Sequence, residues 1–300
     1  MPRGPLTIVA PAKLNLTLDI LATLPQGYHA VHMVLQSVDL CDRVTLLQGE
    51  GEISVHCPGF LPQGEENIVH RAALAFFEAA GRAIEAVELH IEKNIPVAAG
   101  LGGGSADAAA VLLGLNAWTG SPLSQSRLLE TAALVGADVP FCLLGGTMLA
   151  EGFGEKLRPL APMPDGFLVL VHAGKKDSTG AMYARFDQLA QRPPEQTGSM
   201  LGALEQGNLG CVAGALGNAF EGLSNVEQGK TARRILIEAG ALGCSLSGSG
   251  PTVYGVFARQ EDARIAKNRC IQAGFVSHIC RPLARGCHVE GENLPPTVLP

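Results

Sequence analysis

Hydrophobic residues recur along this chain with two periods, every second residue in some segments and every third or fourth in others. The first period predicts β-strands, and the second predicts helices with one apolar face. Strands are predicted at 6–10, 14–20, 33–40, 43–48, 53–57, 87–92, 167–171, 244–246, 252–258 and 276–281. Helices are predicted at 67–80, 124–135, 230–239 and 261–273, with shorter helical patches near residue 182, at 201–205 and at 212–220. This mixture of elements predicts an α+β fold.

A proline-rich segment at 159–164 (PLAPMP) interrupts these patterns. It predicts a boundary between a domain of residues 1–160 and a second domain of residues 161–285. The order strand, helix, strand, helix, strand after the boundary indicates that the second domain is a smaller α+β unit. Residues 286–300 are polar and proline-rich, so we expect a loosely attached tail.

The alternation at 14–20 decides which face of that strand is polar. Its apolar residues occupy the even positions, whereas Lys13 and Asn15 occupy odd positions on the opposite face. We therefore expect a lysine and an amide to share one polar surface of this strand.

A glycine-rich run at 96–105 (PVAAGLGGGS) leads directly into an almost wholly apolar segment at 106–116. Because glycine has no Cβ, its amide can approach a ligand closely and its φ can be positive. Ser105 has the position expected for a helix N-cap, and Asp107 is expected to be solvated near the positive end of the helix dipole. Free amides at a helix N-terminus favour anions, so the run predicts a phosphate-binding loop.

Two common nucleotide-binding motifs do not fit this chain. Ser224 stands where a Walker A pattern ending at Thr231 requires its first glycine. A dinucleotide pattern beginning at Gly100 has Ser105 in place of its last glycine, and no acidic residue ends a strand about twenty residues later. The phosphate-binding loop therefore belongs to neither of these classes.

Composition narrows the class of protein further. The chain has 300 residues, 47% of them hydrophobic, and a net charge of −6, which argues against binding to nucleic acid or to an acidic membrane. Its eight cysteines form no CxxC pair and no cluster with zinc-ligand spacing, so reduced thiols are expected. No signal peptide and no membrane span is evident, and a cytoplasmic protein is predicted.

Five motifs occur in order: PAKLN at 11–15, GYH at 27–29, GLGGGSADAAA at 100–110, GADVPF at 136–141 and LSGSGPT at 246–252. This set resembles the GHMP kinase superfamily, whose members include galacto-, homoserine, mevalonate and phosphomevalonate kinases. It is most similar to the branch that phosphorylates the 2-hydroxyl of 4-diphosphocytidyl-2-C-methyl-D-erythritol in the non-mevalonate isoprenoid pathway. Each motif is weak alone, but their common order is highly specific.

The resemblance implies a two-domain fold, with an N-terminal ATP-binding α/β domain and a smaller ferredoxin-like α+β domain. ATP, Mg²⁺ and the small-molecule substrate are then expected to bind in the cleft between the domains. The resemblance implies that Ser105 contacts a phosphate group or Mg²⁺. The residues expected to surround the ATP phosphates are Pro96, Val97, Ala98, Ala99, Gly100, Leu101, Gly102, Gly103, Gly104, Ser105 and Ala106.

Asp138 lies in an otherwise apolar segment at 136–144, where an unpaired carboxylate is costly. By resemblance Asp138 is the catalytic base, and Lys13 lies beside it and stabilises the alkoxide that develops on the substrate. The sequence leaves open how the catalytic effect divides between them. Tyr28 and Tyr183 are expected on opposite faces of the cytosine ring. The substrate contacts implied by the resemblance are Asn15, Tyr28, His29, Thr179, Tyr183 and Gly248.

The sequence departs from the family pattern at Gln26, where aspartate is usual, and at Ala106, where a second serine is common. The resemblance is also weaker at 175–228. Three alternatives therefore stay open: another GHMP kinase acting on homoserine or mevalonate, a nucleotide-binding protein of the same fold without turnover, and, more remotely, a dehydrogenase that uses the glycine run.

Overall fold

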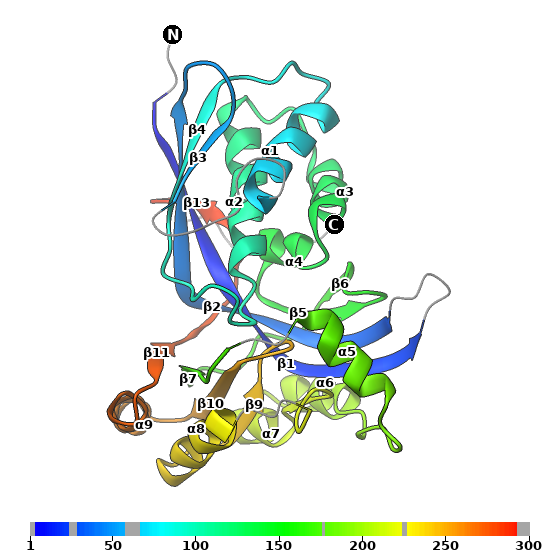
Figure 1. Cartoon of the computed structure of the whole chain (residues 1–300), viewed down its shortest axis with the longest axis vertical. Helices are drawn as coiled ribbons and strands as arrows, with labels where there is room; N and C mark the ends of the chain where they lie inside the picture. The colour runs from blue at the N-terminus through cyan, green and yellow to red at the C-terminus, as the bar shows by residue number, and fades with distance from the viewer. Residues whose placement is uncertain (1–3, 24–28, 58–66, 176–177, 224–226, 293–300) are drawn as a thin grey trace.

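Two long strands dominate the computed structural model, which describes residues 4–23, 29–57, 67–175, 178–223 and 227–292. β1 (Leu6–Thr23) and β2 (His29–Gln48) pair in antiparallel fashion along most of their length (Figure 1). The sequence predicts two shorter strands in each of these places. Shifts in the register, one of them between Pro11 and Ala12, accommodate the interruptions as bulges, so each ladder continues as one strand.

The first sheet extends from this pair. In the described part of the chain it has nine strands, with the main path β13-β1-β2-β4-β3. β5 and β12 pair with β2, β6 pairs with β5, and β8 pairs with β1. The bounds of the strands not yet given are β3 (Ser54–His56), β4 (Val87–Glu92), β5 (Thr147–Glu151), β6 (Lys156–Pro159), β8 (Gly217–Asn218), β12 (Pro282–Leu283) and β13 (His288–Val289).

Helices cover one face of this sheet (Figure 1). The central helix follows the glycine run and is apolar around most of its circumference, so it is buried between β1 and the other helices. The helices of this domain are α1 (Ile68–Ala79), α2 (Gly103–Trp118), α3 (Gln125–Val135) and α4 (Val139–Leu144). The N-terminus of α2 faces the second domain (Figure 1).

The C-terminal domain contains a four-stranded antiparallel sheet in the order β11-β7-β10-β9. In chain order these strands are numbers 4, 1, 3 and 2 of their sheet, which is the predicted ferredoxin-like arrangement. The strands are β7 (Phe167–His172), β9 (Gly243–Leu246), β10 (Thr252–Phe257) and β11 (Val276–Cys280). The helices are α5 (Thr179–Asp187), α6 (Thr197–Glu205), α7 (Leu209–Gly214), α8 (Glu227–Glu238) and α9 (Gln260–Gln272).

The polar face of β1 is enclosed, because Lys13, Asn15 and Thr17 are as buried as the leucines opposite. The expectation of a loosely attached tail is wrong for residues 286–292. Gly286 and Cys287 donate backbone hydrogen bonds to α4, and β13 then pairs with β1. The apolar Cys287 side chain is buried, which fixes this return to the first domain.

Within the described ranges, no helix combines the length and the apolar character that a membrane span requires.

Candidate active site

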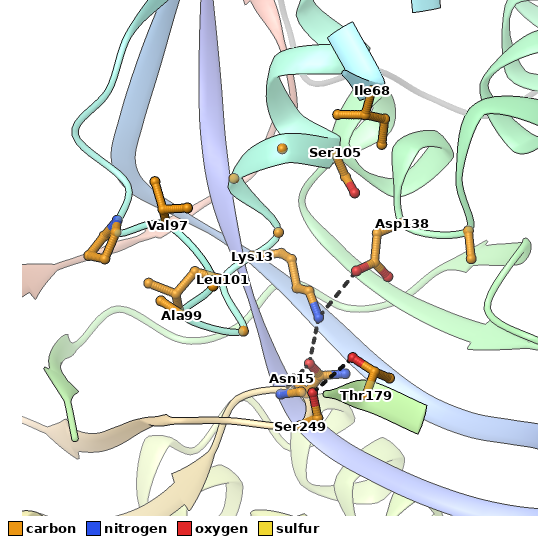
Figure 2. Close-up of a pocket in the computed structure, with 18 of the residues that line it drawn as sticks. Lys13, Asn15, Ile68, Val97, Ala99, Leu101, Ser105, Asp138, Thr179 and Ser249 are labelled. Atoms are coloured by element: carbon orange, nitrogen blue, oxygen red, sulfur yellow. Dashed lines mark hydrogen bonds and ion pairs between the residues drawn. The ribbon is translucent and has the colours of Figure 1, made fainter. Parts of the chain in front are cut away.

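A cleft of about 570 Å³ lies where the two domains meet. The glycine-rich loop and the N-terminus of α2 form one side, and α5 with the turn between β9 and β10 forms the other. β1 contributes Lys13 and Asn15 to its floor, and Asp138 lies at the start of α4 (Figure 2). Segments from distant parts of the sequence therefore converge on one cavity, as the sequence motifs predict.

The glycines of the loop are required by its contacts. Gly102 is the N-cap of α2 with a φ of 71°, and a Cβ on it would lie 2.8 Å from Cγ of Lys13. Gly100 has a φ of 80°, and a Cβ there would lie 2.4 Å from the carbonyl oxygen of Ser247. Ser105 therefore lies inside the first turn of α2, and the expectation that it is the N-cap is wrong. Its hydroxyl points toward the cleft (Figure 2).

Lys13 is almost fully buried, with only 5% of its surface exposed. Its backbone N–H donates to the carbonyl of Leu101 at 2.9 Å, which ties β1 to the glycine loop. Its Nζ donates to Oδ1 of Asn15 at 2.8 Å and lies 3.5 Å from Oδ2 of Asp138. The ammonium group is thus oriented toward the cleft by two polar neighbours rather than by solvent.

Asp138 precedes α4 in the N-cap position, yet its side chain makes no capping hydrogen bond. The carboxylate is about one-third exposed and faces both Lys13 and the cleft (Figure 2). A capping role, the structural alternative for this residue, therefore does not account for its position. The geometry leaves the carboxylate able to accept a proton from a group bound in the cleft.

The turn between β9 and β10 joins the two domains at the cleft. Its Gly248 N–H donates to Oδ1 of Asn15 at 2.9 Å, and the Ser247 hydroxyl donates to the carbonyl of Gly100 at 3.0 Å. Ser249 and Thr179 share a hydrogen bond at 3.2 Å between their hydroxyl groups. Asn15 therefore contacts Lys13 and Gly248 together, and Thr179 and Gly248 line the same cavity.

Three aromatic side chains lie together at the end of the cleft near α5. The rings of His29 and Tyr183 are stacked, with centroids 4.6 Å apart, and Tyr183 packs edge-on against Phe220 at 5.0 Å. His29 also pairs with Asp187 through Nε2 at 2.7 Å. The structure thus brings Tyr183 against His29, whereas the sequence reasoning expects it to face Tyr28 across a ligand. Tyr28 lies outside the described residues.

A buried charged cluster behind the loop was missed by sequence reasoning. Lys93 bonds to Asp42 and, at 2.7 Å, to Asp107, while Asp42 accepts backbone hydrogen bonds from Asn94 and Ile95 at 2.6 and 2.8 Å. Asp107 is 3% exposed, so the expectation of a solvated carboxylate is wrong. Lys93 also lines the cleft, and the cluster anchors both ends of the glycine loop.

Burial raises the pKa of Asp107 from its ordinary 3.8 to about 8, with Lys93 opposing the shift and Asp42 adding to it. The folded protein then retains a proton that the unfolded chain releases above about pH 4. Stability is therefore expected to fall as the pH rises from about 4 to about 8. Asp107→Asn should flatten this part of the profile, measured by denaturant unfolding at each pH. Asp262→Asn, at an exposed pair with Arg259, is the control and should leave the profile unchanged.

Comparisons with known proteins agree with this geometry. The model of the GHMP kinase N-terminal domain matches residues 67–146, and that of the GHMP kinase C-terminal domain matches residues 200–276. A 4-diphosphocytidyl-2-C-methyl-D-erythritol kinase from Pelotomaculum thermopropionicum is 44% identical over 263 residues, covering 86% of this chain and 91% of the relative. The same-named protein of Geobacter metallireducens is 43% identical, covering 86% and 92%. The chain belongs to this family of GHMP kinases.

Solved structures extend the comparison. A crystal structure of a 4-(cytidine 5'-diphospho)-2C-methyl-D-erythritol kinase is 33% identical with a TM-score of 0.77, covering 92% of this chain and 98% of the other. A homoserine kinase from Cytophaga hutchinsonii has the same TM-score but only 21% identity, covering 95% and 97%, and shares the fold alone. The two-domain GHMP kinase fold is thus confirmed, and the protein is an ATP-dependent kinase of a small molecule.

Proposed function

We propose that this kinase transfers the γ-phosphate of ATP to the 2-hydroxyl of 4-diphosphocytidyl-2-C-methyl-D-erythritol, with Mg²⁺ as the metal. The pairing of Lys13 and Asp138 at 3.5 Å, beside the glycine loop in the same cleft, is the observation that carries the proposal. Relatives at 38–44% identity that bear this kinase name support the choice of substrate. The glycine loop supplies the phosphate contacts, and the opposite end of the cleft receives the cytidine group.

Asp138 acts as the base in this proposal. Its carboxylate accepts the proton of the substrate hydroxyl, and the oxygen so activated attacks the γ-phosphorus. Lys13 lies close enough to stabilise the negative charge on that oxygen, because its Nζ is held by Asn15 within reach of Asp138. Phosphoryl transfer requires mainly positioning and charge stabilisation, and Lys13 and Asp138 together provide both.

The glycine loop binds the phosphates through its backbone. Positive φ angles at Ala98, Gly100 and Gly102 turn the backbone at every second residue, and the N-terminus of α2 adds its dipole. Residues 96–106 are the proposed phosphate contacts. A positive φ at a residue with a Cβ, as at Ala98, costs free energy, which supports a functional reason for the loop's shape.

The donor set beside the loop fits Mg²⁺. The Ser105 hydroxyl and the Asp138 carboxylate both present oxygen atoms to the same part of the cleft, and Mg²⁺ prefers oxygen ligands together with water and phosphate (Figure 2). Ser105 is the proposed protein ligand, with Asp138 nearby. When bound, the metal would neutralise charge on the transferred phosphoryl group.

Substrate contacts are proposed for Asn15, His29, Thr179, Tyr183 and Gly248. Four of them line the cleft, and His29 stacks on Tyr183 at its edge. In this arrangement Tyr183 offers the cytosine ring an edge or its remaining face, while His29 is oriented by Asp187. The substrate contact of Tyr28 and the domain limits of 1–160 and 161–285 stay predictions. Residues 281–292 return to the first sheet through β12 and β13.

A coupled assay of ADP release tests the substrate. We expect turnover with ATP, Mg²⁺ and the cytidylated alcohol, and none above background with homoserine or mevalonate. Turnover with homoserine or mevalonate alone would assign the protein to another GHMP kinase. ATP binding without turnover on any of the three alcohols would instead favour the non-catalytic alternative.

Gly102 provides a separate test of how Lys13 is positioned. Gly102→Ala is expected to cost about 1–2 kcal/mol through its positive φ and also to displace the Lys13 side chain, lowering kcat. Gly120→Ala is the matched control, since Gly120 has a φ of 87° but open space around a Cβ. Equal losses of kcat in the two variants would show that strain alone, and not contact with Lys13, determines the effect.

A further inference from the structure

Three potential metal ligands lie together on the first sheet, outside the cleft. β3 pairs in parallel with β4, with His56 opposite His90 and Ser54 opposite Glu88. Val87, Leu89 and Ile91 of β4 are buried beneath the helices, so Glu88 and His90 project from the other face of the sheet. Among the residues that the structure describes, no helix covers that face near β3 and β4 (Figure 1). His56, Glu88 and His90 thus share one accessible surface.

The separations suit a small divalent ion. One candidate ligand atom from each residue lies within 4.8 Å of the other two. Nε2 of His90 is 3.2 Å from Oε2 of Glu88, close to the distance of about 3.3 Å between two ligands of tetrahedral zinc with bonds of about 2.0–2.1 Å. The imidazole rings of His56 and His90 are stacked with centroids 4.5 Å apart. A small rotation of the exposed His56 side chain therefore suffices to bring the third ligand into place.

We propose that His56, Glu88 and His90 bind one Zn²⁺ ion, with a water molecule as the fourth ligand. Two imidazoles and a carboxylate are a common zinc-ligand set, and three protein ligands leave one position open. The Ser54 hydroxyl lies 3.2 Å from Nε2 of His56, so coordination through Nδ1 keeps this hydrogen bond as an orienting contact.

The surrounding charges favour a cation. Glu92 lies two residues beyond His90 on the same face of β4 and adds a second carboxylate. Arg43 lies opposite Glu92 in the strand register, but its guanidinium group bonds to Glu290 at 2.8 Å. Its positive charge is therefore already paired. The site discriminates against Mg²⁺, because imidazole nitrogens suit zinc whereas Mg²⁺ demands oxygen ligands. The proposed ion is therefore distinct from the metal of phosphoryl transfer.

Spacing rules for metal motifs do not reveal this site. Its ligands come from two strands separated by a segment that includes α1, and only the parallel pairing of β3 with β4 brings them together. Zinc would connect the three-residue edge strand β3 to its neighbour β4 through side chains. Binding is expected to raise the melting temperature of the metal-free protein.

Calorimetric titration of the reduced, chelator-treated full chain with Zn²⁺, in the absence of ATP, tests the proposal. The wild type should bind one more equivalent than His90→Asn, and Glu88→Gln should bind that equivalent at least tenfold more weakly. His278→Asn, on β11 of the other sheet, is the matched control and should bind like the wild type. Equal stoichiometry and affinity in the wild type and His90→Asn would overturn the proposal.

Cobalt provides an independent readout, because the eight cysteines could also bind zinc. Co²⁺ at the proposed site should give the visible bands of a tetrahedral nitrogen and oxygen environment, and these should vanish in His90→Asn. A thiolate charge-transfer band that accompanies the first equivalent in both proteins would place the metal on cysteine and overturn the proposal. Turnover with Mg²⁺ and ATP should be unchanged in His90→Asn, showing that this variant folds.

Discussion

Asp138→Asn is expected to lower kcat by about 10²–10⁴-fold while ATP still binds. The amide keeps the size and hydrogen-bonding capacity of the side chain but cannot accept the proton of the substrate hydroxyl. Because the carboxylate makes no capping bond to α4, the substitution should not disturb that helix. Initial rates with saturating ATP and substrate measure kcat, and calorimetry measures ATP affinity.

Lys13→Met tests the second member of the pair and should also abolish turnover with ATP binding retained. Methionine fills the enclosed space occupied by the lysine stem, so the loss reports on the charge rather than on a cavity. Glu227→Gln, at an exposed ion pair with Lys230, serves as the control and should keep wild-type kcat. Retained turnover in both Asp138→Asn and Lys13→Met would remove this pair from the chemistry.

Lys93→Met should destabilise the protein by about 3–5 kcal/mol, because it leaves two buried carboxyl groups of Asp42 and Asp107 without their shared cation. The KM for ATP should rise as well, since Asp42 holds the backbone at Asn94 and Ile95, where the loop begins. Chemical denaturation measures the loss of stability, and steady-state kinetics measures KM.

A second substitution tests whether an unpaired carboxyl group causes the loss of stability. Adding Asp107→Asn to Lys93→Met removes one of the two unpaired carboxyl groups, so part of the lost stability should return. Lys230→Met, at an exposed pair with Glu227, should change stability by less than about 1 kcal/mol. No recovery in the double variant would mean that the unpaired Asp107 carboxyl group is not the cause of the lost stability.

The meeting of Lys13, Asp138 and the glycine loop in one cleft could be predicted, because each of them lies in a short sequence motif. Lys13 stands two residues before Asn15, and Asp138 stands out as a carboxylate in an apolar segment. The ferredoxin-like order of β7, β9, β10 and β11 was likewise predictable, since each strand has its own apolar pattern and the resemblance supplied their arrangement.

The contacts that sequence reasoning missed join residues far apart in the chain. Lys93 lies 51 residues from Asp42, and nothing in the local pattern around either residue signals the pairing. Asp107 looked solvated because helix-start carboxylates usually are, yet its carboxylate is 3% exposed and bonds to Lys93. The stacking of Tyr183 on His29 depends on where α5 packs, which no periodicity specifies.

β1 belongs to both domains at once. Its first half pairs with β13 and its second half with β8, while β2 accompanies it along most of its length. A hinge that opened the two domains would have to break this ladder, whose buried hydrogen bonds are costly to expose. We therefore expect ligand entry and product release to depend on local movements of the glycine loop and α5, not on separation of the domains. Hydrogen exchange should then be slow throughout the centre of β1, with or without nucleotide.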